Sequence, residues 1–146
     1  MLKITPSFTF SGQCAQAIEL YKKAFGAKVK VKLLFSDAQP NDFQCSDEEK
    51  DYIFHCQLMI GEQMVILSDD SGKMLNDDVQ SKTGKTYLQN LLISFRSDDD
   101  LQAAYSALED GATIVIPMKR TAYAQNYVFL VDRYGGRWEL MSQSQK

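Results

Sequence analysis

The sequence is poor in cysteine and histidine, with three cysteines and one histidine in 146 residues. Cys14, Cys45 and Cys56 are odd in number and form no CxxC pair. This pattern argues against a disulfide framework and against a zinc knuckle. The single histidine, His55, directly precedes Cys56, and neighbours in a strand point to opposite faces, so we expect no thiol–imidazole dyad. Reduced thiols are typical of a cytoplasmic protein.

The chain also lacks a surplus of positive charge and any long apolar run. Its formal net charge is −3, which gives no electrostatic footprint for nucleic acid or for an anionic membrane. No apolar run approaches the roughly 20 residues that a membrane span needs. The apolar stretch at the first residues is too short, and too interrupted by polar residues, for a signal peptide. We therefore expect a cytoplasmic protein that binds neither nucleic acid nor membrane.

What the sequence does contain is two similar series of short elements. Apolar residues recur three or four apart over residues 14–25 and 101–108, which predicts two helices that end at Gly26 and Gly111. Strand-like segments surround them. They cover residues 4–10, 27–35, 52–60, 63–68, 87–95, 112–117, 126–131 and 137–142. The remaining segments, 36–51 and 69–86, are polar and predicted to be loops.

The order of these elements is βαβββ followed by βαβββ. We predict an α+β fold of two βαβββ modules that form a curved mixed sheet with a central cleft, because a lone module leaves one sheet face bare. Residues 1–146 would form one domain, with module one at about 1–70 and module two at about 86–144. A cleft between modules is the expected place for function.

Three stretches of the sequence resemble PhnB-like proteins of the vicinal oxygen chelate superfamily, which includes glyoxalase I, bleomycin-resistance proteins and extradiol dioxygenases. They are Pro6 to Cys14 with the helix that follows, Phe54 to Gly61 with Ser68-Asp69, and Pro117 to Trp138 with its Asp-Arg-Tyr-Gly-Gly-Arg-Trp run. The resemblance implies paired βαβββ modules and a homodimer. Some relatives are called methyltransferase-like, but this chain has no glycine-rich nucleotide-binding turn after a strand.

The resemblance also implies where a divalent metal would bind. Metal-using members take His or Glu ligands from the first and last strands of each module. Those places fall on Pro6, Val65 or Ile66, Asn90 and Glu139. Only Glu139 is a strong ligand, and a hard cation usually needs several. No cofactor is therefore certain, and a divalent metal ion remains the alternative.

Glu139 and His55 are the predicted catalytic residues. An inward-facing Glu139 is a candidate for acid–base work. His55 is in step with Gln57 along its strand, and two interpretations stay open. It is either a cleft imidazole that faces Glu139, as a base or as a shared metal ligand, or a hydrogen-bonded histidine of the sheet.

The remaining site candidates line the expected cleft. The predicted substrate-binding residues are Phe8, Gln57, Asn90, Tyr123, Tyr127 and Trp138. Most aromatic residues, Phe129 included, also fit a core or a dimer interface. The leading functional prediction is a small-molecule binding protein of the bleomycin-resistance kind. The alternatives are a divalent-metal-dependent lyase, isomerase or oxygenase, and a structural homodimer, so whether the chain is an enzyme stays open.

Overall fold

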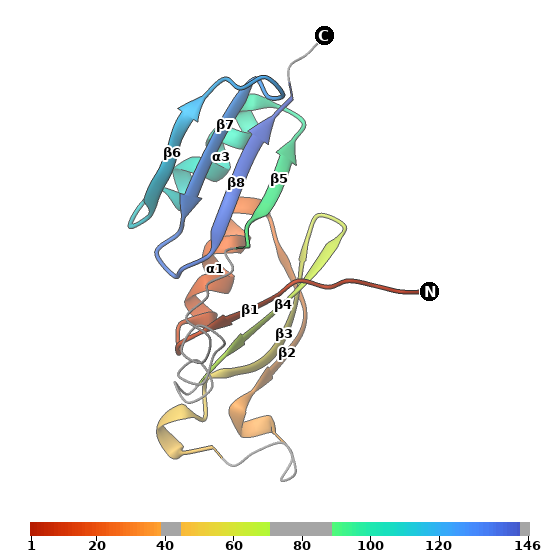
Figure 1. The fold of residues 1–146 in the computed structure, drawn as a ribbon. Helices are drawn as coiled ribbons and strands as arrows, with labels where there is room; N and C mark the ends of the chain where they lie inside the picture. Colours follow the sequence, from red (N-terminus) through yellow and green to blue (C-terminus); the bar gives the residue numbers. More distant parts are fainter. Residues whose placement is uncertain (39–44, 71–88, 144–146) are drawn as a thin grey trace, which may run out of the picture. The chain divides into compact units, whose positions relative to one another are not determined.

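The computed structural model describes residues 1–38, 45–70 and 89–143 (Figure 1). The chain divides into two compact units, Met1–Thr86 and Tyr87–Lys146. Most of the loop predicted at 69–86 lies outside the described residues. The prediction that residues 1–146 form one domain stays a prediction.

The first unit is a βαβββ module. Its elements are β1 (Ser7–Phe10), α1 (Cys14–Phe25), β2 (Lys28–Leu34), β3 (Ile53–Ile60) and β4 (Gln63–Asp69). The sheet order is β1-β4-β3-β2, with β1 parallel to β4 and the other pairs antiparallel. Between β2 and β3, where a loop is predicted, two short 3-10 turns form at Phe35–Asp37 and Asp47–Glu49.

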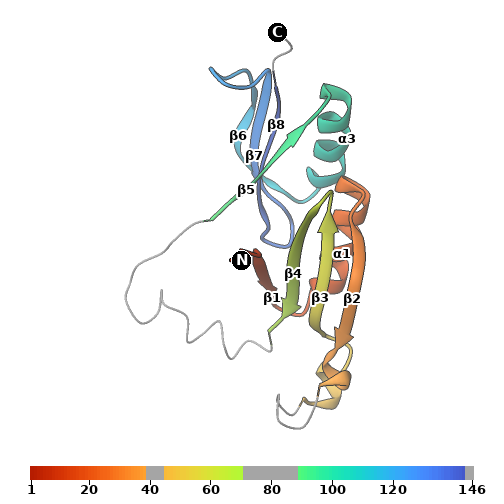
Figure 2. The same cartoon turned by 90° about the vertical axis from the view of Figure 1, so that its right-hand side faces the viewer.

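Helix α1 has the predicted bounds, and local chemistry explains both ends. Its first N–H, from Cys14, donates to the Asp69 carboxylate at the end of β4 at 2.9 Å. Its last turn closes on Gly26, whose φ of 64° is left-handed and whose N–H reaches Lys22 O. The apolar side, with Ala17 and Ile18 fully buried, packs on one face of the sheet (Figure 2).

The second unit repeats this arrangement. Its elements are β5 (Leu91–Phe95), α3 (Asp98–Leu108), β6 (Thr113–Lys119), β7 (Asn126–Val131) and β8 (Arg137–Ser142). The order β5-β8-β7-β6, with β5 parallel to β8, matches the first sheet strand for strand. The predicted α+β fold of two βαβββ modules is therefore confirmed.

Helix α3 begins with a side-chain cap. Ser97 Oγ accepts the N–H of Asp100 at 3.2 Å, and three aspartates fill the first turn, where the helix dipole favours negative charge. Leu101 and Leu108 are fully buried against the sheet, which α3 covers on one face (Figure 1). None of the described helices is long and apolar enough to cross a membrane.

Alternation along β8 gives the second sheet two different faces. Trp138 and Leu140 are fully buried on the side of α3. Arg137, Glu139 and Met141 therefore point to the opposite side, because neighbouring strand residues alternate. We call this side, which α3 does not cover, the open face of the second sheet.

Candidate functional site

The open face of the second sheet carries an aromatic cluster. Tyr127 and Phe129 are only 5% and 6% exposed, although α3 lies on the other side of the sheet. They pack with the buried Ala124, and Ile116 and Met141 lie against them. The result is an apolar floor built from β6, β7 and β8.

A short hydrogen bond crosses this floor. The Tyr127 hydroxyl donates to Glu139 Oε1 at 2.5 Å, which is the range of a charge-assisted O–H···O⁻ bond. Glu139 pairs with Phe129 in the ladder and Tyr127 with Met141, so the two partners are diagonal neighbours on adjacent strands. A tyrosine is long enough to span that diagonal.

The environment keeps Tyr127 protonated. Burial raises the pKa of the Tyr127 phenol, and the hydrogen bond to the Glu139 carboxylate and its charge raise that pKa further. The hydroxyl therefore stays protonated, and able to donate, to a higher pH than an ordinary tyrosine. Glu139 is half-buried, and among the described residues its second oxygen has no protein partner. That oxygen can therefore accept a further hydrogen bond.

Tyr123 extends the aromatic cluster to the surface. Its ring meets Tyr127 edge-on, with centroids 6.0 Å apart and planes at 78°. The side chain is largely exposed, at 62%. The structure thus brings together three residues that the sequence singles out, Tyr123, Tyr127 and Glu139.

Arg137 is the functional candidate that sequence reasoning missed. Its Nε donates to Asn90 Oδ1 at 2.9 Å, and its guanidinium carbon lies 5.1 Å from the centre of the Phe129 ring. Arg137 stands two residues before Glu139 in one strand, so the period of two could have placed both on one face. The predicted residue Asn90 is exposed just before β5, and the β5 residue that pairs with Glu139 is Leu92.

Two predicted substrate-binding residues lie elsewhere. Trp138 is fully buried on the α3 side, where its indole N–H donates to Asp132 Oδ2 at 2.8 Å. It directly precedes Glu139 in β8 and therefore cannot share the open face. Phe8 pairs with the fully buried Leu67, on the side of the first sheet that α1 covers. The structure thus does not bring Trp138 or Phe8 together with Tyr127 and Glu139, and their predicted contact with a substrate stays a prediction.

The remaining candidates, His55 and Gln57, belong to the first unit. Both are half-buried, and their side chains approach to 3.4 Å between His55 Nε2 and Gln57 Nε2. They alternate with Cys56, which is fully buried and whose thiol pKa is raised by burial. The predicted partnership of His55 with Glu139 joins residues of two units and stays a prediction.

The donors of the open face do not fit a divalent metal centre. Within residues 1–38, 45–70 and 89–143, no three His, Cys, Asp or Glu side chains gather as a ligand set. Glu139 also has one carboxylate oxygen engaged by Tyr127. A hard cation prefers several oxygen ligands, and the other groups packed on this face are mainly apolar or cationic.

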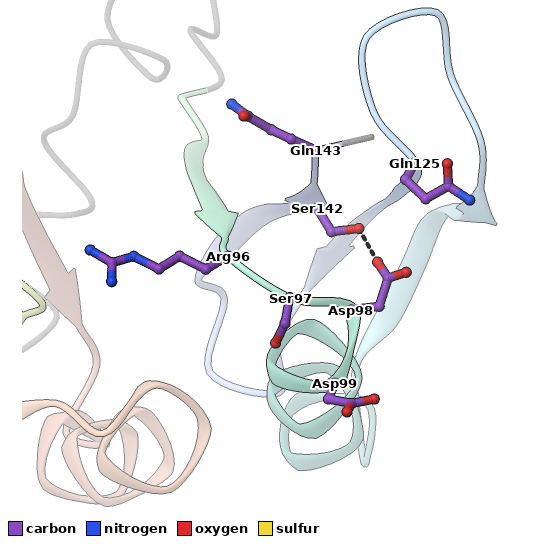
Figure 3. A pocket seen from close by; sticks show the side chains of 7 residues that line it. All are labelled: Arg96, Ser97, Asp98, Asp99, Gln125, Ser142 and Gln143. Carbon is purple, nitrogen blue, oxygen red and sulfur yellow. Dashed lines mark hydrogen bonds between the residues drawn. The ribbon is translucent and has the colours of Figure 1, made fainter. Parts of the chain in front are cut away.

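A cavity of about 410 Å³ opens at a different place, beside the start of α3 (Figure 3). It is lined by Arg96, Ser97, Asp98, Asp99, Gln125, Ser142 and Gln143. Ser142 Oγ donates to Asp98 Oδ1 across it, and this bond holds the pKa of Asp98 below its usual value, with help from Asn126. None of the predicted site residues lines this cavity, and its bonds tie β8 to the beginning of α3.

Comparison with known proteins agrees with this architecture. A protein from Pseudomonas aeruginosa (PA1353) has a TM-score of 0.78 and 22% identity, over 99% of this chain and 100% of its own. A putative 3-demethylubiquinone-9 3-methyltransferase, PhnB protein, from Bacillus cereus has a TM-score of 0.74 and 16% identity, over 97% and 99%. The fosfomycin resistance protein FosX from Mesorhizobium loti has a TM-score of 0.60 and 11% identity, over 99% and 94%.

At these identities the three structures show a shared fold. No protein of curated function matches the chain. The model of the glyoxalase/bleomycin resistance protein/dioxygenase superfamily matches residues 8–140, which is nearly the whole chain. The chain therefore belongs to the glyoxalase/bleomycin resistance protein/dioxygenase superfamily, as its sequence motifs predict.

Proposed function

We propose that this protein binds a small organic molecule on the open face of the second sheet, around Tyr127 and Glu139. One observation carries the proposal. A buried phenol and a half-buried carboxylate share a 2.5 Å hydrogen bond on a sheet face that its own helix leaves uncovered.

The composition of this face is that of a ligand site. Small-molecule sites combine a mainly apolar lining with a few placed polar groups. Here Phe129, Met141 and Ile116 supply the apolar surface. Glu139 supplies an acceptor, and the Tyr127 hydroxyl fixes the orientation of that acceptor.

A neutral aromatic alcohol provides the direct test, because its ring suits Phe129 and its hydroxyl suits the second oxygen of Glu139. We expect 2-phenylethanol at millimolar concentration to shift backbone amide resonances of β7 and β8 in ¹H–¹⁵N spectra. We expect weaker binding to Glu139→Ala, and unchanged binding to Glu109→Ala, an exposed residue just after α3. Resonance shifts confined to the first unit or to the cavity beside α3 would contradict the proposal.

The sequence-based proposal that His55 and Gln57 contact the same ligand has its own test. Substituting His55→Ala or Gln57→Ala should then weaken the binding of 2-phenylethanol as Glu139→Ala does. The matched control is Gln63→Ala, an exposed residue of β4 in the same unit. Unchanged affinity in both variants would mean that the ligand contacts neither His55 nor Gln57 and binds to the second unit alone.

Catalysis with a divalent metal is the alternative that the superfamily suggests. It requires ligands beyond the Glu139 carboxylate, because one such group does not hold a hard cation. Calorimetric titration of the purified protein with Mn²⁺, Ni²⁺ and Zn²⁺ measures this directly. Stoichiometric binding that Glu139→Gln abolishes would favour the metal-dependent function.

The resemblance further leads us to propose a homodimer in the cytoplasm. Sedimentation velocity of the purified chain, whose mass is 16.5 kDa, distinguishes a dimer from a monomer. A single species at the monomer mass over the micromolar range would contradict this proposal.

A further inference from the structure

The open face of the second sheet holds two opposite charges that do not neutralise each other. Arg137 and Glu139 are two residues apart on β8 and point to the same side. The ion pairs formed by the described residues are Lys22–Glu19 and Arg133–Asp110, and neither involves Arg137 or Glu139. Both charged groups therefore remain available to a third molecule.

The position of the Arg137 guanidinium is fixed by two contacts that leave its charge unpaired. Nε is held by Asn90 Oδ1 at 2.9 Å, and the guanidinium carbon lies 5.1 Å from the centre of the Phe129 ring. Phe129 is also the ladder partner of Glu139, and no ion pair joins Arg137 to Glu139 among the described residues. The two terminal nitrogens have no partner among the described residues, and they carry the pair of donors that suits a carboxylate.

Glu139 is oriented in a complementary way. Tyr127 occupies Oε1, which leaves Oε2 as an acceptor on the same face of β8 as Arg137. A ligand that fits both must present an anion to Arg137 and a hydrogen-bond donor to Glu139, with an apolar part for Phe129. We propose that the ligands of this face are small organic acids that carry a nearby hydroxyl or amino group. This inference rests on the proposed binding function and specifies its ligand class.

Three related compounds separate the contributions of anion and donor. The probe is 3-phenyllactate, which has a ring, a carboxylate and an α-hydroxyl. Its methyl ester removes the negative charge, and 3-phenylpropionate removes the hydroxyl. We expect the acid to bind about tenfold or more tightly than its ester, since a charge-assisted bidentate contact is lost. We expect a smaller loss for 3-phenylpropionate, measured by calorimetry or by resonance shifts.

Variants assign these losses to residues. Arg137→Gln should abolish the difference in affinity between the acid and its ester. Arg137→Lys should retain only part of this difference, because lysine lacks the planar guanidinium that binds a carboxylate through two hydrogen bonds. Glu139→Gln should abolish the difference in affinity between 3-phenyllactate and 3-phenylpropionate. Arg133→Gln is the matched control, because Arg133 is exposed and lies in the turn between β7 and β8. It should leave all three affinities unchanged.

The outcomes distinguish this inference from the function on which it rests. If 2-phenylethanol binds at β7 and β8 but the acid and its ester bind equally, the ligand class is wrong and the binding function stands. An acid preference that survives Arg137→Gln would also overturn the inference. If neither the alcohol nor any of the three phenyl compounds binds at millimolar concentration, both are overturned.

Discussion

The carboxylate of Asp132 accepts a hydrogen bond from the indole N–H of Trp138 at 2.8 Å, on the side of the second sheet that α3 covers. The other oxygen of the same carboxylate accepts the backbone N–H groups of Tyr134 and Gly136, at 2.8 and 3.0 Å. One side chain thus closes the β7–β8 turn and anchors the residue that precedes Glu139. Asp132 thereby joins the β7–β8 turn to the strand that carries Arg137 and Glu139.

Substituting Asp132→Ala should therefore destabilise the protein strongly. Three N–H groups lose their acceptor at a position that is only 4% exposed, and unpaired buried donors are costly. We expect a loss of about 2–4 kcal/mol in the free energy of unfolding, measured by urea denaturation. The control is Asp110→Ala, whose side chain is 87% exposed and 3.8 Å from Arg133, with an expected change within about 0.5 kcal/mol. Equal losses in the two variants would contradict this role.

The hydrogen bond between Tyr127 and Glu139 should also be measurable as stability. Tyr127→Phe keeps the ring in the aromatic cluster and removes only the donor to the carboxylate. We expect a loss of about 1–2 kcal/mol in the free energy of unfolding. Tyr123→Phe is a matched control, because its ring is exposed and contacts the same cluster edge-on. A stability change no larger than that of Tyr123→Phe would show that the bond contributes nothing.

A third prediction concerns alkaline pH. An unfolded tyrosine ionises near pH 10, whereas burial and Glu139 raise the pKa of folded Tyr127 above that value. Above about pH 10 the unfolded chain releases a proton that the folded chain keeps, so the contribution of Tyr127 to stability falls as pH rises. The difference in unfolding free energy between wild type and Tyr127→Phe should shrink between about pH 9 and pH 11. A difference that stays constant over this range would contradict the raised pKa.

Local signals explain why most of the fold could be predicted. The helical spacing from Cys14 and the glycine at position 26 define α1 completely, and β7 and β8 begin and end where their β-rich segments do. β1 begins at Ser7, later than predicted, after Pro6, which has no N–H to donate to a ladder. The 3-10 turns after β2 were not predicted, because a polar segment carries no apolar periodicity to reveal them.

The candidate site was only partly predictable, because it depends on register between strands. Glu139 and Tyr127 could each be selected from the sequence, but their hydrogen bond follows from the pairing of Phe129 with Glu139 and of Tyr127 with Met141. This pairing of residues between strands could not be predicted from the sequence. Trp138 and Glu139 are neighbours in the same motif, but they lie on opposite faces of the sheet because neighbouring strand residues alternate.

Gly12 provides the last prediction, about the connection between β1 and α1. Its φ is +86°, and a Cβ at this position would lie 2.8 Å from Cζ and Oη of Tyr52. Tyr52 in turn packs edge-on against Phe35, with centroids 5.6 Å apart, so its ring cannot move away without disturbing that contact. Gly12→Ala should therefore combine backbone strain with a steric clash. The matched control, Gly26→Ala, has a φ of +64° and no atom within 4 Å of its Cβ.

Because both glycines are left-handed, the strain of about 1–2 kcal/mol is common to the two variants. The clash should make Gly12→Ala more costly by about 1 kcal/mol in the free energy of unfolding. In a Tyr52→Ala background that excess should disappear, since the opposing ring is gone, and the double-mutant cycle measures the coupling. An excess that persists without the Tyr52 ring would place its origin in the backbone of the β1–α1 connection instead.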